Sequence, residues 1–152
     1  MPRMPFWRGE APKREFYLGR RLGEFRRLLA ERVAELPPFP DEVDADWPAA
    51  ALAVRDWLRG EYAMDENSAR NAILYVRRQL EAVGAISSDR TVVVETFTDA
   101  LGDQRLIVHS CFGGRVNSAW ALALSHAIRE RYRLDIETQV NDDGILIRLV
   151  QA

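Results

Sequence analysis

The stretch Thr91-Val92-Val93-Val94-Glu95-Thr96-Phe97-Thr98 decides how this chain folds, because the sequence changes there from a helical to an extended pattern. It is short and rich in β-branched residues, which is typical of a β-strand. Leu101-Gly102-Asp103 supplies residues that favour a turn, and residues 105–112 form a second β-rich stretch. We therefore predict that these two strands pair as an antiparallel hairpin.

Downstream of this hairpin the sequence predicts one helix and a second hairpin. Gly113-Gly114 breaks the second strand, and apolar residues at helical spacing indicate a helix over residues 118–132. Residues 134–140 and 145–150 are two further strands, joined by the turn-forming Asn141-Asp142-Asp143-Gly144. The order is therefore strand, strand, helix, strand, strand.

Upstream of the strands, apolar residues recur at helical spacing in three segments, residues 15–36, 48–59 and 66–83. Pro48 suits the first turn of the second helix and Gly60 its end. Further residues that predict helix boundaries are Pro37, Asp65 and Gly84. The N-terminal part is thus expected to be helical.

These patterns predict an α+β fold: an N-terminal helical part of about three helices, then a four-stranded antiparallel sheet with one helix packed on it. Residues 1–14 are expected to be an extended lead-in, and residues 15–152 a single domain with a helical part at 15–84 and a sheet part at 91–152. The expected core of the sheet part comprises Val92, Val94, Leu106, Val108, Ile136, Ile145, Ile147 and Leu149 from the strands, and Trp120, Leu124 and Ile128 from the helix.

Composition favours a soluble, intracellular protein, and we expect it to be cytoplasmic. The chain has 152 residues, a net charge of −2 and a single cysteine, Cys111, so it can form no internal disulfide. No apolar run approaches the roughly 20 residues that span a bilayer. The charge is uneven, because residues 1–35 contain nine basic and five acidic side chains. A basic head of this kind suits either a nucleic-acid contact or a solvated helix face.

Five strings, in order and at similar spacing, resemble large helicase-related (Lhr) proteins; the first resembles the linker that follows their winged-helix part, and the last resembles their DEAD/H-associated region. They are Pro5-Phe6-Trp7-Arg8-Gly9-Glu10; Asp65-Glu66-Asn67 before Ala69-Arg70-Asn71; Val93-Val94-Glu95-Thr96-Phe97-Thr98-Asp99 with Gly102-Asp103; His109-Ser110-Cys111-Phe112-Gly113-Gly114-Arg115-Val116-Asn117 with Trp120-Ala121-Leu122-Ala123-Leu124; and Asp142-Asp143-Gly144-Ile145. The sequence departs from the family at Cys111, where a proline is usual, and at Pro12-Lys13-Arg14, where Pro-Gly-Arg is usual.

The resemblance implies a larger parent protein, an ATP-dependent 3′-to-5′ translocase on single-stranded nucleic acid that acts in DNA repair. In such a parent, residues 1–14 would enter from a preceding winged-helix region. ATP and Mg²⁺ would bind in two helicase lobes outside this chain. The implied partners are single-stranded DNA or an RNA:DNA hybrid, together with the lobes and the winged-helix domain.

The chain itself is not expected to be an enzyme, and we assign it no catalytic residue, cofactor or metal. Phosphate-binding loops of nucleotide hydrolases need a glycine-rich turn with a lysine, and the only lysine, Lys13, lies in no such loop. Asp41-Glu42-Val43-Asp44 matches the acidic Mg²⁺-binding box of helicases by letters only. It follows prolines rather than an apolar strand, so we interpret it as a chance match.

Trp7 is the best candidate for contacting nucleic acid. Its ring, flanked by Arg3 and Arg8, could stack on an unpaired base while the arginines meet phosphates. The alternative is that Phe6 and Trp7 pin the lead-in to the helical part, and the residues favour neither reading.

Arg115 is the fourth candidate, because Gly113-Gly114 precedes a helix whose free amides would suit a phosphate. The helix cap is expected at Asn117 or Ser118. A simple turn that needs positive φ is the competing and favoured interpretation.

Two other groups carry weaker hypotheses. His109, Cys111 and His126 offer too few partners for a zinc site or a catalytic dyad. The third helix carries arginines that could touch phosphates, but nearby carboxylates favour a solvated face; they are Arg70, Arg77 and Arg78. The leading hypotheses for the whole chain are a nucleic-acid-contacting module and a scaffold that packs against the helicase lobes, with an independent enzyme well below both.

Overall fold

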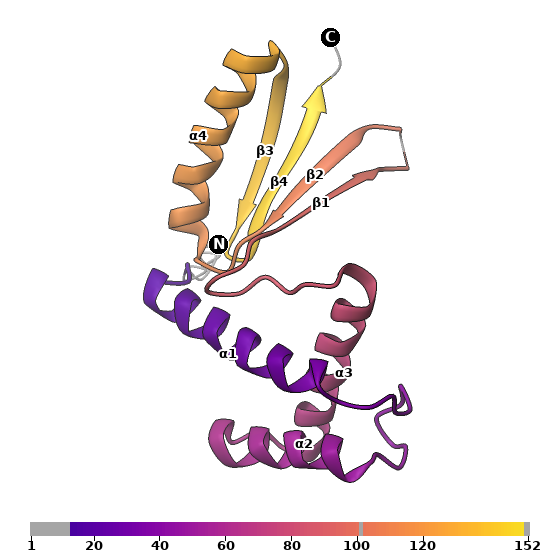
Figure 1. Ribbon diagram of the computed structural model, residues 1–152. Coiled ribbons are helices and arrows are strands. Elements are labelled where there is room, and N and C mark those ends of the chain that lie inside the picture. Colours follow the sequence, from indigo (N-terminus) through magenta and orange to yellow (C-terminus); the bar gives the residue numbers. More distant parts are fainter. Residues whose placement is uncertain (1–12, 101, 151–152) are drawn as a thin grey trace, which may run out of the picture.

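The structure is a computed structural model that describes residues 13–100 and 102–150. Three helices come first, followed by two strands, a helix and two strands (Figure 1). In chain order the elements are α1 (Phe16–Ala34), α2 (Ala49–Tyr62), α3 (Glu66–Val83), β1 (Val93–Thr98), β2 (Gln104–His109), α4 (Gly114–Tyr132), β3 (Asp135–Asn141) and β4 (Gly144–Val150). The predicted α+β class and order of elements are therefore confirmed.

The helical part has its own hydrophobic core, in which α3 packs against both α1 and α2. Asp65 begins α3 as predicted, because its carboxylate accepts a hydrogen bond from the Ser68 amide at 2.7 Å. Gly84 ends the same helix in a left-handed conformation with φ of 74°. The buried residues of this core are Leu29, Ala30, Val33, Trp47, Ala51, Val54, Leu58, Ala69, Ile73, Leu74, Val76 and Ile86.

The prediction that Gly60 ends the second helix is wrong. Helix α2 continues to Tyr62, and Ala63 ends it with φ of 51°. The ring of Tyr62 packs edge-on against Phe25 at 4.7 Å and Trp57 at 5.1 Å between ring centroids. The contact with Phe25 of α1, supported by that with Trp57 of the same helix, holds the last turn in helical geometry and outweighs the local preference of glycine for a helix end.

The four strands form one antiparallel sheet in the order β1-β2-β4-β3. Two hairpins therefore lie side by side, and β2 joins them by pairing with β4, with Val108 opposite Ile145. Helix α4 packs against β3 and β4, whereas the β1–β2 hairpin extends away from it (Figure 1).

This placement of α4 corrects the predicted core at one edge of the sheet. Val92 and Val94 are 40% and 56% exposed, because β1 is the edge strand farthest from the strands that α4 covers. The other predicted core residues are confirmed, and they pack with Ala121 and Val140; they are Leu106, Val108, Trp120, Leu124, Ile128, Ile136, Ile145, Ile147 and Leu149.

The boundaries of β1, β2 and α4 also differ from the sequence prediction. β1 starts at Val93, because the Ser88 amide bonds to the Thr91 carbonyl and turns the chain before it. β2 ends at His109, and the chain then turns before α4 begins at Gly114, four residues earlier than expected. The cause of this early helix start is described with the candidate site below.

The helical and sheet parts meet where α1 passes two loops at very short range. A Cβ atom on Gly19 would lie 2.3 Å from the Cys111 carbonyl oxygen, and one on Gly23 would lie 2.5 Å from the Asp89 amide nitrogen. Glycine is required at both positions for this approach. Arg27, on the same helix, donates to the Asp89 carboxylate at 2.9 Å. We call this contact between α1 and the loops at 87–89 and 110–112 the glycine seam.

Candidate nucleic-acid interface

Three of the four residues predicted to contact nucleic acid, Trp7, Arg8 and Arg3, lie outside the described residues. The fourth, Arg115, stands in the first turn of α4 and is exposed. Its guanidinium lies 3.1 Å from the Glu15 carboxylate, which is also exposed. Ion pairs of this kind contribute at most about 1 kcal/mol, so Arg115 can exchange Glu15 for another anion at little cost.

The backbone amide at the start of α4 is occupied by a carboxylate from the same chain. The Asp142 side chain accepts from the Gly114 amide at 2.7 Å and from the Arg14 amide at 3.0 Å. These hydrogen bonds lower the pKa of Asp142 below its usual range, and the bond from the Arg14 amide has the largest effect. The charged carboxylate stabilises the helix start and explains why α4 begins at Gly114.

The N-cap of α4 is Gly113, with φ of 93°, rather than Asn117 or Ser118. A Cβ atom at Gly113 would lie 2.3 Å from the Arg14 carbonyl oxygen, so this turn needs glycine both for its positive φ and for space. The favoured interpretation of the glycine pair as a positive-φ turn is confirmed. The Gly114 amide is engaged by Asp142, whereas a phosphate contact of Arg115 stays a prediction.

Arg14 fixes the described end of the lead-in against the β3–β4 turn. Its guanidinium donates to the Asp143 carboxylate at 2.7 Å and to the Asp142 carbonyl at 3.2 Å. The neighbouring Lys13 side chain comes within 3.9 Å of the Cβ position of Gly114. The chain therefore joins the folded body beside the start of α4, on the side where Arg115 stands.

A buried polar cluster supports this corner of the molecule and was not foreseen from sequence. Asn117 is fully buried; its amide group donates to the carbonyls of Ser110 at 3.1 Å and Asn141 at 3.0 Å. Its side-chain oxygen accepts from the Ser110 hydroxyl at 2.7 Å. The cluster ties the end of β2, the first turn of α4 and the β3–β4 turn together.

The arginines of α3 hold the acidic loop that precedes α2. Arg70 donates to the carbonyls of Val43 and Ala45 at 2.8 and 3.0 Å, and its guanidinium lies over the Trp47 ring at 4.7 Å. The roles of these donors are therefore structural, and Arg70 is not available to a phosphate.

Asp41 receives the other two arginines of that helix. Arg77 and Arg78 both donate to its carboxylate, Arg78 at 3.0 Å, and these bonds, led by that from Arg78, lower the pKa of Asp41. Arg77 also lies over the Phe39 ring at 4.1 Å. A carboxylate engaged in this way does not form a metal site, and no metal-binding cluster of His, Cys, Asp or Glu occurs within residues 13–100 and 102–150.

The Cys/His combination is not assembled. His109 contacts the Glu95 carboxylate at 3.1 Å on the sheet face opposite α4, whereas His126 lies exposed on α4 itself. Cys111 is fully buried, its thiol donates to the Ser88 carbonyl at 3.4 Å, and burial raises its pKa. The thiol is therefore protonated and shielded, which does not suit a nucleophile.

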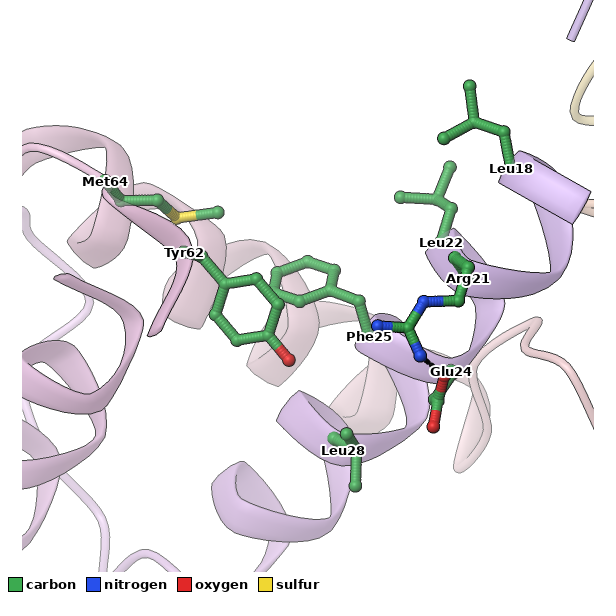
Figure 2. Close-up of a pocket in the computed structure, with 8 residues that line it drawn as sticks. All are labelled: Leu18, Arg21, Leu22, Glu24, Phe25, Leu28, Tyr62 and Met64. Atoms are coloured by element: carbon green, nitrogen blue, oxygen red, sulfur yellow. Dashed lines mark hydrogen bonds and ion pairs between the residues drawn. The ribbon is translucent and has the colours of Figure 1, made fainter. Parts of the chain in front are cut away.

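An apolar groove of about 420 Å³ lies between α1 and the α2–α3 corner. Figure 2 shows the Phe25 and Tyr62 rings side by side in it, with Met64 on the corner and an Arg21–Glu24 ion pair of 2.7 Å at its rim. Its remaining lining residues are Leu18, Leu22 and Leu28. Leu18 is 59% exposed, so this face presents aliphatic surface to solvent. Within the part of the chain that the structure describes, no helix has the length and apolarity to cross a bilayer.

Comparisons with known proteins agree with this architecture. Residues 86–152 match the DEAD/H associated family. The chain is 38% identical over 147 residues to the "Lhr helicase/probable uracil glycosylase" of Mycolicibacterium smegmatis. The matched segment covers 97% of this chain and 9% of that protein. It is 32% identical over 150 residues to the Lhr helicase/uracil glycosylase of Escherichia coli, covering 97% of this chain and 8% of that protein.

A solved structure of an Lhr helicase is also similar to this chain. The structure of Mycobacterium smegmatis helicase Lhr bound to ssDNA and AMP-PNP superposes with a TM-score of 0.71 and 36% identity, covering 98% of this chain and 17% of that one. The chain thus spans less than a tenth of the length of the two curated relatives. Taken with the five sequence strings and the fold, these matches show that this chain belongs to the Lhr helicase family, with residues 86–152 forming its DEAD/H associated region.

Proposed function

We propose that this chain is an accessory domain of an ATP-dependent 3′-to-5′ helicase of DNA repair, in which it contacts or positions single-stranded nucleic acid. The observation that carries this proposal is its likeness to the Lhr helicase solved with ssDNA, at 36% identity over nearly the whole of this chain. Single-stranded DNA or an RNA:DNA hybrid would be the ligand. In this proposal ATP and Mg²⁺ bind in helicase lobes outside the chain, and the chain has no catalysis of its own.

The lead-in is the proposed place of contact. Trp7, Arg8 and Arg3 precede the segment that Arg14 holds beside the start of α4, and exposed Arg115 stands at the same corner. This arrangement supports a contact in which the indole stacks on a base and the arginines meet phosphates. Stacking on an aromatic side chain is worth about 1–3 kcal/mol per base, so Trp7→Ala should weaken binding by about 5- to 150-fold.

The test is a fluorescence anisotropy titration of the full chain with a labelled oligothymidylate, repeated across salt concentrations. We expect binding that weakens with salt, a loss of affinity in Trp7→Ala and partial recovery in Trp7→Phe. Arg90→Gln is the charge control, because Arg90 is 73% exposed and lies in the loop before β1. A Trp7→Ala protein with unaltered affinity would refute the assignment of the lead-in.

A scaffold role is the second candidate, in which the chain packs against the helicase lobes and the winged-helix domain without touching nucleic acid. The apolar groove of Figure 2 favours it, because Leu18, Leu22 and Phe25 offer surface that a neighbouring domain could cover. If the chain binds no oligonucleotide at any salt concentration, this role replaces the first.

A further inference from the structure

A second hollow of about 420 Å³ lies at the junction of α1, α3 and the sheet. Its floor is apolar and comes from the two helices, with Leu22, Leu29 and Val76 among its residues. Arg26 of α1 and Tyr75 of α3 also line it. This size falls in the range of about 300–1,000 Å³ that is usual for small-ligand sites. We call it the junction cleft.

Arg26 is the unusual residue of the junction cleft. It is half-buried, yet no hydrogen bond or ion pair joins its guanidinium to any residue in the described ranges. Every other half-buried arginine of these ranges donates to a carboxylate or a carbonyl; they are Arg14, Arg27, Arg32, Arg55, Arg70, Arg77, Arg105 and Arg148. A guanidinium has five N–H donors, and those of Arg26 still reach solvent, because the buried side-chain nitrogens without a partner in the described residues do not include any of its atoms. They are therefore free to bind a group from outside the chain. An anion from outside would satisfy them.

Tyr75 supplies an aromatic surface in the same cleft as this cation. Its side chain is 56% exposed, and no hydrogen bond or ring contact holds it within the described ranges. Two polar residues line the sheet side of the cleft: His109 contacts Glu95 at 3.1 Å, and Asp143 is paired with Arg14 at 2.7 Å. The carboxylates of Glu95 and Asp143 thus have partners of their own, His109 and Arg14. Among the described residues that line the cleft, Arg26 is therefore the charged residue without a partner.

We propose that the junction cleft binds one nucleotide of a single strand, with Arg26 meeting a phosphate and Tyr75 stacking on the base. This inference rests on the proposed function, because it adds a second contact for the same strand. A polypeptide carboxylate would also satisfy Arg26. The exposed ring that lines the same cleft as the guanidinium favours a nucleotide, because aromatic and arginine side chains together form the usual platform for unpaired bases.

The experiment measures oligothymidylate binding by the full chain across salt concentrations for Arg26→Gln and Tyr75→Leu. Losing one phosphate contact should reduce the slope of log affinity against log salt by about 0.7. Losing the stacked base should weaken binding by at least about fivefold. The matched controls are Arg20→Gln, an exposed arginine of the same helix, and Tyr17→Leu, whose tyrosine is 71% exposed on α1. Thermal unfolding verifies that all four variants keep the fold.

Photocrosslinking gives an independent readout of the geometry. An oligonucleotide that carries 5-iodouracil should crosslink to Tyr75, and mass spectrometry of the digested complex identifies the modified peptide. We expect this crosslink to diminish in Arg26→Gln, because the phosphate contact positions the base.

Unchanged affinity and salt slope in both cleft variants, or equal losses in the two controls, would overturn the inference. If Trp7→Ala weakens binding while Arg26→Gln and Tyr75→Leu do not, the proposed function stands and the junction cleft is assigned to a polypeptide carboxylate instead. A chain that binds no single strand contradicts both proposals.

Discussion

Replacing Gly23 with alanine should destabilise this protein, although alanine is the better helix former. In an exposed helix interior the change from glycine to alanine gains about 1 kcal/mol. At Gly23, however, the new Cβ would lie 2.5 Å from the Asp89 amide nitrogen and 2.7 Å from the Cys111 sulfur. Favourable contacts between non-bonded carbon atoms occur at about 3.5–4.0 Å. Either α1 or the loops of the glycine seam must therefore move.

The cost of that movement can be worked out from the neighbours. One neighbour is backbone, and Asp89 is held in place by its ion pair with Arg27 at 2.9 Å. Cys111 is fully buried, so its sulfur has no solvent to move into. Overpacking of this kind costs about 1–3 kcal/mol, and a clash with backbone belongs to the upper part of that range. After subtracting the gain in helix propensity, we expect a net loss of about 1–2 kcal/mol.

Gly60→Ala is the matched control. Gly60 also lies inside a helix, α2, but no atom of the described residues stands within 4 Å of its Cβ position. Alanine should therefore stabilise the protein there by about 0.5–1 kcal/mol. For a domain of this size, about 1 kcal/mol shifts Tm by roughly 2–4 °C. Melting followed by far-UV circular dichroism should thus show Gly23→Ala lower by about 2–8 °C and Gly60→Ala higher by about 1–4 °C.

Comparing Gly23→Ala with Gly60→Ala tests how closely α1 approaches the loops of the glycine seam. If Gly23→Ala were as stable as Gly60→Ala, α1 could not approach the loops as closely as the structure shows. Urea unfolding at constant pH supplies the same comparison in free energy, and an unchanged m-value would show that the unfolded states are comparable.

Three further predictions follow from the corner beside α4 and from the seam. Asn117→Ala should cost about 2–4 kcal/mol in urea unfolding, because buried carbonyls lose their donor; the exposed helix residue Asn71 is the control, and equal losses for both would contradict the role of the cluster. Because amide hydrogen bonds lower the pKa of Asp142, its stabilising effect is complete above its unfolded pKa of about 3.9 and is lost as pH falls through the lower folded pKa. The urea concentration at the unfolding midpoint should therefore fall as the pH is lowered below about 4. This fall should be less steep in Asp142→Asn than in the unaltered protein, and identical pH profiles of the two would disprove the role of Asp142. Cys111 should react with a thiol reagent only slowly until urea unfolds the chain, since burial both shields it and raises its pKa; rapid labelling of the folded protein would count against the structure.

The order of elements could be predicted because periodicity is a local property that a single sequence carries. The amphipathic stripes and the turn residues located all four helices and strands to within a few positions. Which strands α4 covers could not be predicted in this way. Val92 and Val94 have the same β-branched character as buried Val108, and only the position of α4 over β3 and β4 makes them exposed. The continuation of α2 past Gly60 likewise depends on a contact between the Tyr62 ring and Phe25 of α1, which is far away in sequence.

The candidate site was predicted less completely, because its features join residues far apart in sequence. Asp142 was expected only to form a turn, and its bonds to Arg14 and Gly114 depend on tertiary structure. The unpaired state of Arg26 has no sequence signal, since α1 carries five arginines and three of them have partners; those three are Arg21, Arg27 and Arg32. The glycines of the seam did carry a signal, because Gly19 and Gly23 lie four residues apart on one helix face. The roles of Trp7, Arg8 and Arg3 stay predictions.

The glycine seam also determines how cooperatively the protein can unfold. The two hydrophobic cores have no buried residue in common, and the elements of each pack chiefly among themselves. Cooperative units that are weakly joined can open separately, each with its own free energy. We therefore expect the short contacts of Gly19 and Gly23, together with the Arg27–Asp89 pair, to couple the helical and sheet parts so that they exchange their amide hydrogens as one unit. Loosening the seam would give the molecule two independent opening reactions in place of one.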